Sequence, residues 1–388
     1  MISTKERYNQ RIHNLKQASN HEEPDNIPIY SMWATWPTAL AGEKTEELFY
    51  DYERLLKVWS HAFETVYTDC ALNLGTAGAL PVLQRLGSTA YFISEDGVTL
   101  QHKQNCAMTS EDYPAMIEDP MALMVDVLSK RKFPALNGSD EEIYQTLKDC
   151  AIEYINIAEA NGKLSKLASD QYGIVQLHRG VRAHPPLDVL FDRVRGFNGT
   201  LTDLRRHGDQ VLEATQALYP IYEAFLQKGL KNMGDQFSFA NTMVHSPTFI
   251  GQKYFEKYFW PTYKPLLMQI AEANAKIIMF LEGDWSHLLQ YLRDVPKSTV
   301  LAVLEATDLF QAKKEIGDHI SLMGGVPTSI LRYSSKQECL DYAKRVLDEC
   351  APGGGFLFGT ERVLMTENDV NTENMVAVNE YVRVHGAK

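Results

Sequence analysis

The sequence predicts an α/β protein built as a (β/α)8 TIM barrel, with an insertion and an N-terminal helical extension. Eight short apolar runs occur along the chain, and longer helix-like segments separate them. Runs without alternating polar residues are typical of parallel strands that are covered on both faces. No GxGxxG follows any of these runs, and this disfavours the doubly wound sheet that is the alternative.

The predicted strands, in chain order, are residues 26–32, 70–75, 172–178, 237–244, 276–283, 298–306, 319–326 and 354–361. Between them, the segments 45–66, 250–273 and 336–350 place apolar residues three and four apart, as amphipathic helices do. The glycines at 353–355 precede the last predicted strand, so we expect them to form the loop after helix 336–350.

Residues 86–170 do not fit a single β–α unit. Residues 88–104 have the pattern of a hairpin with Asp96-Gly97 at its turn, and a long helical region follows around 139–162. We therefore expect one barrel domain over residues 1–388, with 86–170 packed over the C-terminal rim of the barrel.

Composition restricts the classes of partner. The formal net charge of −12 disfavours binding to nucleic acid or to an anionic membrane, because phosphates would be repelled. The N-terminus lacks the apolar core of a signal peptide, and no apolar stretch reaches a membrane-spanning length of about 18 residues. The five cysteines include no CxxC pair, as expected for buried thiols in a reducing compartment. These features predict a soluble, cytoplasmic protein.

The stretch FLEGDW, residues 280–285, places two acids where a buried strand ends. In a barrel, chemistry collects at the C-terminal ends of the strands, so these acids are expected to face a shared pocket. The same rule selects further candidates after the other strands: Trp33, Trp36, Asn73, His178, Arg179, Asn241, His245, Glu305 and Glu361.

Several of these residues also have a structural interpretation. Asp284 is a good N-cap for a following helix, whereas Glu282 is a poor one. His245 precedes Ser246-Pro247, a pattern typical of a turn before a helix. Glu305 would either act in the chemistry or pair with an arginine at the barrel mouth. Trp33 and Trp36 are expected to contact substrate, because exposed aromatics on a loop are otherwise costly.

Three stretches together resemble the uroporphyrinogen decarboxylase superfamily. Residues 6–30 are similar to its opening helix and entry to the first strand, 246–270 to its aromatic helix with Trp-Pro, and 353–386 to its last strand, acidic loop and final helix. The resemblance covers the whole chain and implies a (β/α)8 barrel. It also implies one of two activities: decarboxylation of a porphyrinogen, or methyl transfer involving a corrinoid protein.

Two departures favour the methyltransferases. The loop 31–43 after the first strand contains no arginine, whereas the decarboxylases use arginines there to hold substrate carboxylates. Gly359-Thr360-Glu361 also stands where the decarboxylases carry Gly-His. A tryptophan-lined entry suits an apolar or aromatic substrate instead.

The resemblance also raises the question of a metal. The methyltransferases commonly bind zinc through His-x-Cys after the fifth strand and a cysteine after the eighth. This chain has Glu282 and Asp284 at the first place and Glu361 near the second. An oxygen-rich set would give a more Lewis-acidic centre, suited to polarising an ether oxygen. A zinc site formed by Glu282, Asp284 and Glu361 is therefore one possibility that the sequence leaves open.

The resulting hypothesis is a methyltransferase that moves a methyl group from a small methylated donor, most plausibly an aryl methyl ether, to the cobalt of a corrinoid. The chain has no corrinoid-binding DxHxxG motif, so the corrinoid is expected on a partner protein. Glu282, His245 and Glu305 are the expected catalytic residues. The expected substrate contacts are Trp33, Trp36, Asn73, His178, Arg179 and Asn241.

Alternatives remain at this stage. A decarboxylase would need convergent cations, which are available from Arg179, Arg182, Arg193, Arg195, Arg205 and Arg206. A corrinoid-to-tetrahydrofolate methyltransferase would share the fold, and so would a non-catalytic binding barrel. The oligomeric state is open, with a homodimer among the options.

Overall fold

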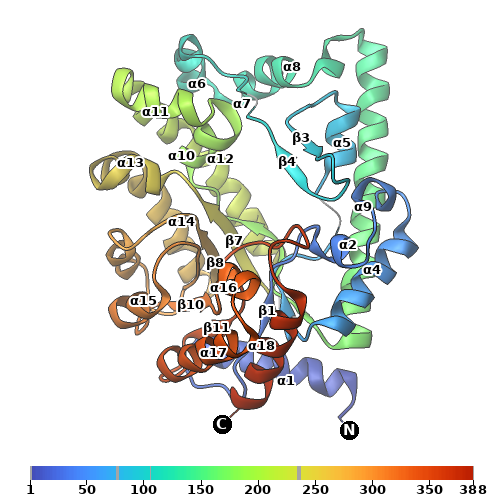
Figure 1. Ribbon diagram of the computed structural model, residues 1–388. Helices are drawn as coiled ribbons and strands as arrows, with labels where there is room; N and C mark the ends of the chain where they lie inside the picture. The colour runs from blue at the N-terminus through green and yellow to red at the C-terminus, as the bar shows by residue number, and fades with distance from the viewer. Residues whose placement is uncertain (1, 76–77, 105, 234–236, 388) are drawn as a thin grey trace.

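The computed structural model describes residues 2–75, 78–104, 106–233 and 237–387. Its centre is a parallel barrel sheet surrounded by helices (Figure 1). The strands are β1 (Tyr30–Ser31), β2 (Cys70–Ala71), β5 (Val175–Gln176), β6 (His178–Arg182), β7 (Phe239–Val244), β8 (Ile277–Leu281), β9 (Val300–Leu304), β10 (Ser321–Gly324) and β11 (Phe356–Phe358). Each strand falls in one of the eight predicted runs or directly continues it, with β5 and β6 sharing the third run.

Strand pairing runs in chain order around the barrel. One sheet has the order β1-β2-β5 and the other β11-β10-β9-β8-β7-β6. Leu177 joins the two sheets, because its N–H donates to Ala71 and its carbonyl accepts from Phe239. On the other side, a parallel bridge links Ile29 to Phe358. The eight strand positions therefore follow one another as in a (β/α)8 barrel, and the predicted fold class is confirmed.

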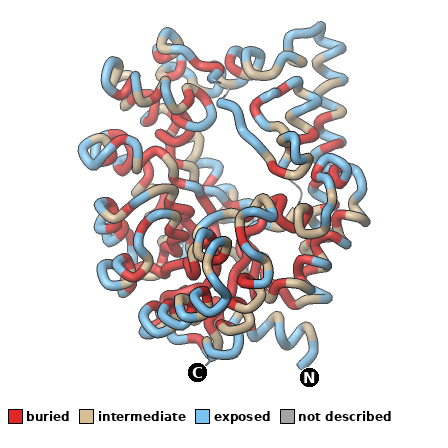
Figure 2. Tube along the Cα trace, viewed as in Figure 1, coloured by how far each residue is buried: buried red, intermediate tan, exposed pale blue. Residues whose placement is uncertain are grey.

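Strands β8, β9 and β11 are wholly apolar, because both of their faces are buried. On β8, Ile278 and Phe280 belong to a cluster that fills the barrel interior with Phe239, Leu301 and other strand residues. The alternate residues of β8 join the cluster between the sheet and the helices. Figure 2 shows the same division, with buried positions on the strands and inner helix faces and exposed positions outside.

The helices that surround the barrel are mostly those expected. The longer ones are α1 (Thr4–Ser19), α4 (Tyr52–Thr65), α9 (Asp140–Tyr172), α11 (Phe197–Arg206), α12 (Gly208–Met233), α13 (Pro247–Tyr254), α14 (Trp260–Glu272), α15 (Leu309–Ile316), α17 (Lys336–Cys350) and α18 (Thr372–His385). Helix α17 has the predicted bounds and begins with a capping box formed by Ser335 and Glu338. No helix among the described residues is long and apolar enough to cross a membrane.

Two predicted helices are interrupted. The segment 45–66 divides into α3 (Thr45–Leu48) and α4, because Asp51 caps the start of α4 through its side chain. The segment 250–273 divides at Gly251, where φ is 67°, and again at a π-helical turn, Phe255–Phe259. The Pro261 that follows occupies the first turn of α14, where its missing N–H costs no hydrogen bond.

Residues 86–170 begin with an antiparallel hairpin of β3 (Tyr91–Ile93) and β4 (Leu100–His102). Asp96 closes its turn by accepting hydrogen bonds from the backbone N–H groups of Val98 and Thr99. Short helical segments follow, including α6 (Tyr113–Glu118), α7 (Pro120–Ala122) and α8 (Ser129–Lys132). Helix α9 then extends ten residues past the predicted end at 162 and stops at Gly173, where φ is 64°.

Candidate active site

A cavity of about 340 Å³ lies at the C-terminal ends of β6, β7 and β8. The residues that follow these strands form its wall, and the β3–β4 hairpin adds Tyr91 and His102. The lining residues are Tyr91, His102, Arg182, His184, Pro185, Asp188, Val189, Asp192, Arg193, Met243, His245 and Glu282. Glu282 and His245, two of the three predicted catalytic residues, therefore share one cavity.

A histidine joins two carboxylates in this wall. Nδ1 of His245 lies 2.8 Å from Oδ1 of Asp192, and Nε2 lies 3.5 Å from Oε2 of Glu282. Burial alone would lower the pKa of His245, but the hydrogen bond to Asp192 and the neighbouring carboxylates raise it above its usual value. The imidazole between Asp192 and Glu282 therefore favours its protonated form more than a free histidine does.

Burial raises the pKa of Glu282 to about 7, in spite of the charge on His245, which lowers it. The charges of Asp192, Glu305 and Asp188 add to the increase. A carboxyl group with this pKa carries a proton for much of the time near neutral pH, so Glu282 can act as a general acid toward the cavity.

Asp188 holds the backbone of His245 in place. It is 4% exposed, and its carboxylate accepts hydrogen bonds from the backbone N–H groups of His245 and Ser246. Burial and the charge of Asp192 raise the pKa of Asp188 to about 7, while those hydrogen bonds lower it. Asp188 thus fixes the turn after β7 that carries His245.

Glu305 positions the loop after β8. Its Oε2 accepts a hydrogen bond of 2.8 Å from the backbone N–H of Gly283, the neighbour of Glu282. Gly283 has φ of 75°, and a Cβ there would lie 2.9 Å from Oγ1 of Thr248, so the loop requires glycine. Glu305 is not among the residues that line the cavity. The structure therefore gives the predicted catalytic Glu305 a supporting position behind Glu282.

Asp188 and Asp192 were not among the candidates selected from the sequence. They lie in α10 (Pro186–Asp188) and the π-helical turn Val189–Val194 that follow β6. Their spacing of four residues, directly after a strand end and Pro185-Pro186, is the signal that could have identified them, because residues four apart share a helix face.

The predicted substrate contacts are scattered. Asn241 is 7% exposed and accepts a hydrogen bond of 3.4 Å from Arg182, so it borders the cavity through that arginine. Asn73 is exposed after β2 and is not among the lining residues. The backbone of Arg179 lies in β6, but its side chain is outside the described part of the structure.

His178 is buried instead of open to a ligand. It is 8% exposed, and its Nε2 accepts a hydrogen bond from the N–H of Gly180. Burial and the charge of Arg182 lower the pKa of His178 to about 4, which keeps the ring neutral. His178 is also absent from the cavity lining, so the structure does not place this predicted substrate contact in the cavity.

The expectation that Trp33 and Trp36 are exposed at the barrel mouth is wrong. They are 2% and 0% exposed, and their ring centroids are 5.1 Å apart. Trp33 also packs against Trp59 and Phe63 of α4. The loop after β1 folds back onto this helix, so the two tryptophans stabilise the core and leave the cavity to other residues.

The predicted metal ligands do not converge. Asp284 accepts hydrogen bonds from the backbone and hydroxyl of Ser286, and Glu361 accepts them from the N–H and hydroxyl of Thr328. Within the described ranges, no three His, Cys, Asp or Glu side chains are arranged to hold a metal ion. The residues present therefore do not fit the zinc site that the sequence left open, and no reaction step is assigned to a metal.

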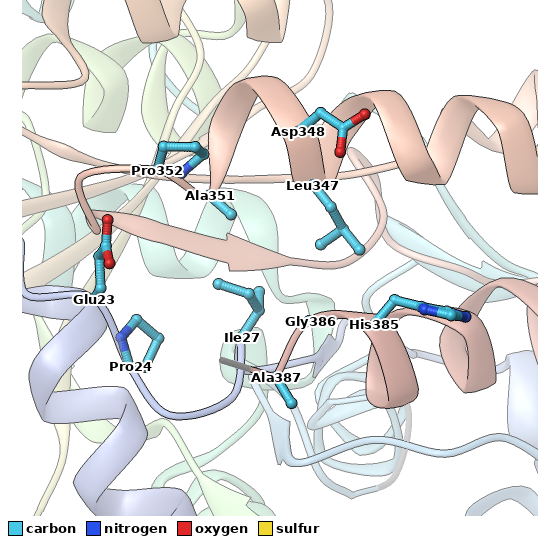
Figure 3. A pocket seen from close by; sticks show the side chains of 10 residues that line it. All are labelled: Glu23, Pro24, Ile27, Leu347, Asp348, Ala351, Pro352, His385, Gly386 and Ala387. Atoms are coloured by element: carbon cyan, nitrogen blue, oxygen red, sulfur yellow. The ribbon is translucent and has the colours of Figure 1, made fainter.

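A second cavity, of about 270 Å³, is lined by residues from the N-terminal and C-terminal parts of the chain (Figure 3). Pro24 and Ile27 precede β1, and Ala351 and Pro352 precede β11, so this cavity belongs to the N-terminal side of the sheet. In barrel enzymes this side supports stability rather than chemistry.

Comparison with known proteins agrees with the geometry. The uroporphyrinogen decarboxylase (URO-D) family matches residues 185–384, just over half of the chain and most of the cavity wall. Among solved structures, a methyltransferase from Methanosarcina mazei superposes with a TM-score of 0.60 over 98% of each chain. At 14% sequence identity that likeness shows a shared fold. No curated protein has a sequence that matches this chain. From the length of the family match, the chain belongs to the uroporphyrinogen decarboxylase family.

Proposed function

We propose that this protein is a methyltransferase that takes the methyl group from an aryl methyl ether and passes it to the cobalt of a corrinoid bound to a partner protein. The observation that carries the proposal is the position of Glu282, with a pKa of about 7, in the wall of a cavity of about 340 Å³ and beside His245. The shared fold with a methyltransferase from Methanosarcina mazei supports it.

The chemistry explains why a proton donor is needed. When the bond between the methyl carbon and the ether oxygen breaks, the oxygen keeps the bonding electron pair. The resulting phenoxide is a poor leaving group at neutral pH. Glu282 delivers its proton to that oxygen as the negative charge develops. The corrinoid cobalt of the partner protein serves only as the methyl acceptor.

Glu282 then carries the negative charge itself, 3.5 Å from the imidazole of His245. Asp192, on the other side of the ring, lies 2.8 Å from Nδ1, and this hydrogen bond raises the pKa of the imidazole and so favours its charged form. The stabilised carboxylate takes up a proton from the bulk solvent before the next turnover, so each turnover consumes one proton. This sequence balances protons and charge without a metal.

Decarboxylation of a porphyrinogen is the second candidate, because Arg182 and Arg193 line the same cavity. The size of the cavity argues against it, since about 340 Å³ is near the lower end for ligand pockets and suits one or two rings rather than a tetrapyrrole. Arg195, another cation in this region, is already paired with Asp203 at 2.6 Å.

The test is the dependence of turnover on the partner. With methoxybenzenes as donors, the purified protein alone should release no phenol, and phenol should appear once a reduced corrinoid protein is added. Decarboxylation of uroporphyrinogen by the isolated protein would overturn the proposal. Methyl transfer from a methylated corrinoid to tetrahydrofolate, without activity on ethers, would instead assign the opposite direction of transfer.

A further inference from the structure

Helix α9 presents two different faces. One face, which includes Cys150, Ile157 and Leu164, is buried against the rest of the chain. Residues on another face follow one another at alternating spacings of four and three, so they share one side of the helix. All of them are exposed, and we call this row the α9 seam: Glu141, Gln145, Lys148, Ile152, Ile155, Glu159, Gly162 and Lys166. Figure 1 shows that α9 runs along one edge of the molecule, where this row is open to a partner.

The centre of the seam is apolar. Ile152 is 50% exposed and Ile155 is 55% exposed. Three further large apolar side chains on the same helix, Tyr144, Leu147 and Tyr154, are also exposed. Single exposed apolar residues are common on protein surfaces, but five large ones on one helix are typical of a contact surface.

The charges of the seam complement themselves when the helix is reversed. In chain order they are Glu141, Lys148, Glu159 and Lys166. If a second copy of α9 runs antiparallel and crosses at the midpoint of the seam, Glu141 lies opposite Lys166 of the partner subunit. In the same register, Lys148 lies opposite Glu159 of the partner subunit. A parallel arrangement would place each charge beside its like, which is unfavourable. The pattern therefore selects a second copy of this chain in the antiparallel direction.

The seam charges are available for such contacts. Glu141, Lys148 and Glu159 form no ion pair with another described residue, and Lys166 pairs with Asp170 on the surface of its own helix. An exposed pair of that kind contributes little, so Lys166 can also face a partner. A membrane surface is a poorer occupant, because helices that lie on anionic bilayers carry mainly lysine and arginine beside their apolar face. The α9 seam carries as many acids as lysines.

The size of the seam sets the strength of the contact. From Glu141 to Lys166 it is about 39 Å long, and with a helix width of about 10 Å its footprint is about 400 Å². A standard stable interface buries about 800 Å² on each partner. The α9 seam therefore suits a reversible contact, with a Kd on the order of tens of micromolar.

From these observations we infer that the protein forms a reversible homodimer in which the α9 helices of two copies pack antiparallel along the seam. Ile152 of one copy contacts Ile155 of the partner subunit at the centre, and the two kinds of charge pair lie on either side. The interface is the same patch on both copies, as in other two-fold dimers. None of the seam residues lines the cavity that contains Glu282, so the inference does not depend on the proposed function.

Sedimentation velocity at protein concentrations from about 1 to about 500 µM tests the dimer. Wild type should change from monomer to dimer across this range. Ile152→Glu places an acid at the apolar centre twice in each dimer, so it should stay monomeric, with circular dichroism to verify folding. The matched control is Val384→Glu, at a residue of α18 that is 60% exposed, and it should dimerise like wild type. A wild-type protein that is monomeric throughout, or a dimer that persists in Ile152→Glu, would overturn the inference.

Charge reversal tests the antiparallel register. Lys148→Glu places an acid opposite Glu159 of the partner subunit, so Kd should rise by on the order of 10- to 100-fold, because like charges in an interface are strongly disfavoured. The double variant Lys148→Glu with Glu159→Lys restores opposite charges and should dimerise with nearly the wild-type Kd. A double variant that is no better than Lys148→Glu, or a Lys148→Glu protein that dimerises like wild type, would contradict the register.

Discussion

Nε2 of His245 lies 3.5 Å from Oε2 of Glu282, across the C-terminal ends of two adjacent barrel strands. The two residues follow β7 and β8, which pair in register from Ala240 and Ile277 to Val244 and Leu281. The N–H of Glu282 also donates to the carbonyl of Val244. The same ladder of hydrogen bonds that builds the barrel therefore sets the distance between Glu282, the proposed proton donor, and the imidazole of His245.

The first prediction concerns pH. The proposed reaction needs the protonated form of Glu282, whose pKa is raised to about 7, so kcat should fall as pH rises through about 7. The charge of His245 lowers that pKa, while those of Asp192, Glu305 and Asp188 raise it. His245→Gln removes the positive charge that lowers the pKa of Glu282. The decrease of kcat with pH (the falling limb of the profile) should therefore move to higher pH, and the maximal rate should drop.

The measurement is the pH dependence of kcat for wild type, His245→Gln and Glu282→Gln with saturating reduced corrinoid protein. Glu282→Gln should show no limb near pH 7. A limb that stays in place in both variants belongs to another group, and a rate that rises through pH 7 contradicts the role of Glu282 as a proton donor.

The second prediction separates support from catalysis at Glu305. Glu305→Gln keeps an oxygen that can accept the N–H of Gly283, so turnover should remain within a few-fold of wild type. Glu305→Ala removes the acceptor and frees the loop that carries Glu282, so kcat should fall by about tenfold, as expected when one hydrogen bond of roughly 1–1.5 kcal/mol is lost. Steady-state kinetics of both variants would decide, and an equal large loss in both would make Glu305 itself a catalytic acid.

The third prediction concerns the tryptophans. Trp36 is fully buried, so Trp36→Ala should lower the free energy of unfolding by about 3–5 kcal/mol through the cavity it leaves. KM for the methyl donor should stay unchanged wherever the variant is folded. Urea unfolding with Tyr50→Ala as a control, at a residue that is 62% exposed, would measure the difference. A raised KM with an unchanged free energy of unfolding would instead indicate that Trp36 contacts the substrate.

The fold could be predicted because barrel strands are buried on both faces. Residues such as Ile277 to Leu281 are apolar on both sides of the sheet, and this gives continuous runs that sequence patterns reveal directly. Glu282 could be located for the same reason, because a carboxylate directly after such a run must lie at the strand end. The interruptions at Gly251 and Phe255–Phe259 could not be predicted, since the apolar spacing continues through them.

The rest of the site depends on contacts between distant segments. Asp188 and Asp192 reach His245 from a segment more than 50 residues earlier in the chain, and no local pattern records that approach. Trp33 was misplaced because the direction in which a loop folds depends on its partner, here Trp59 on α4. Asp284 accepts local hydrogen bonds from Ser286, and Glu361 accepts hydrogen bonds from Thr328, which lies 33 residues earlier in the chain, so neither acid is free to bind the metal that the sequence suggested.

The central claim is that Glu282 protonates the leaving oxygen, and one comparison tests it most directly. Single-turnover methyl transfer from a methoxybenzene to a reduced corrinoid protein would be timed for wild type, Glu282→Gln and the matched control Asp284→Asn, with circular dichroism to verify folding. Loss of a general acid typically costs about 10²–10⁴ in rate, so Glu282→Gln should be slower by that order. Asp284→Asn should stay close to wild type, because an asparagine oxygen can still accept the hydrogen bonds from Ser286. If both variants transfer the methyl group at similar rates, or if Glu282→Gln only lowers the melting temperature, Glu282 is a structural residue and the mechanism is contradicted.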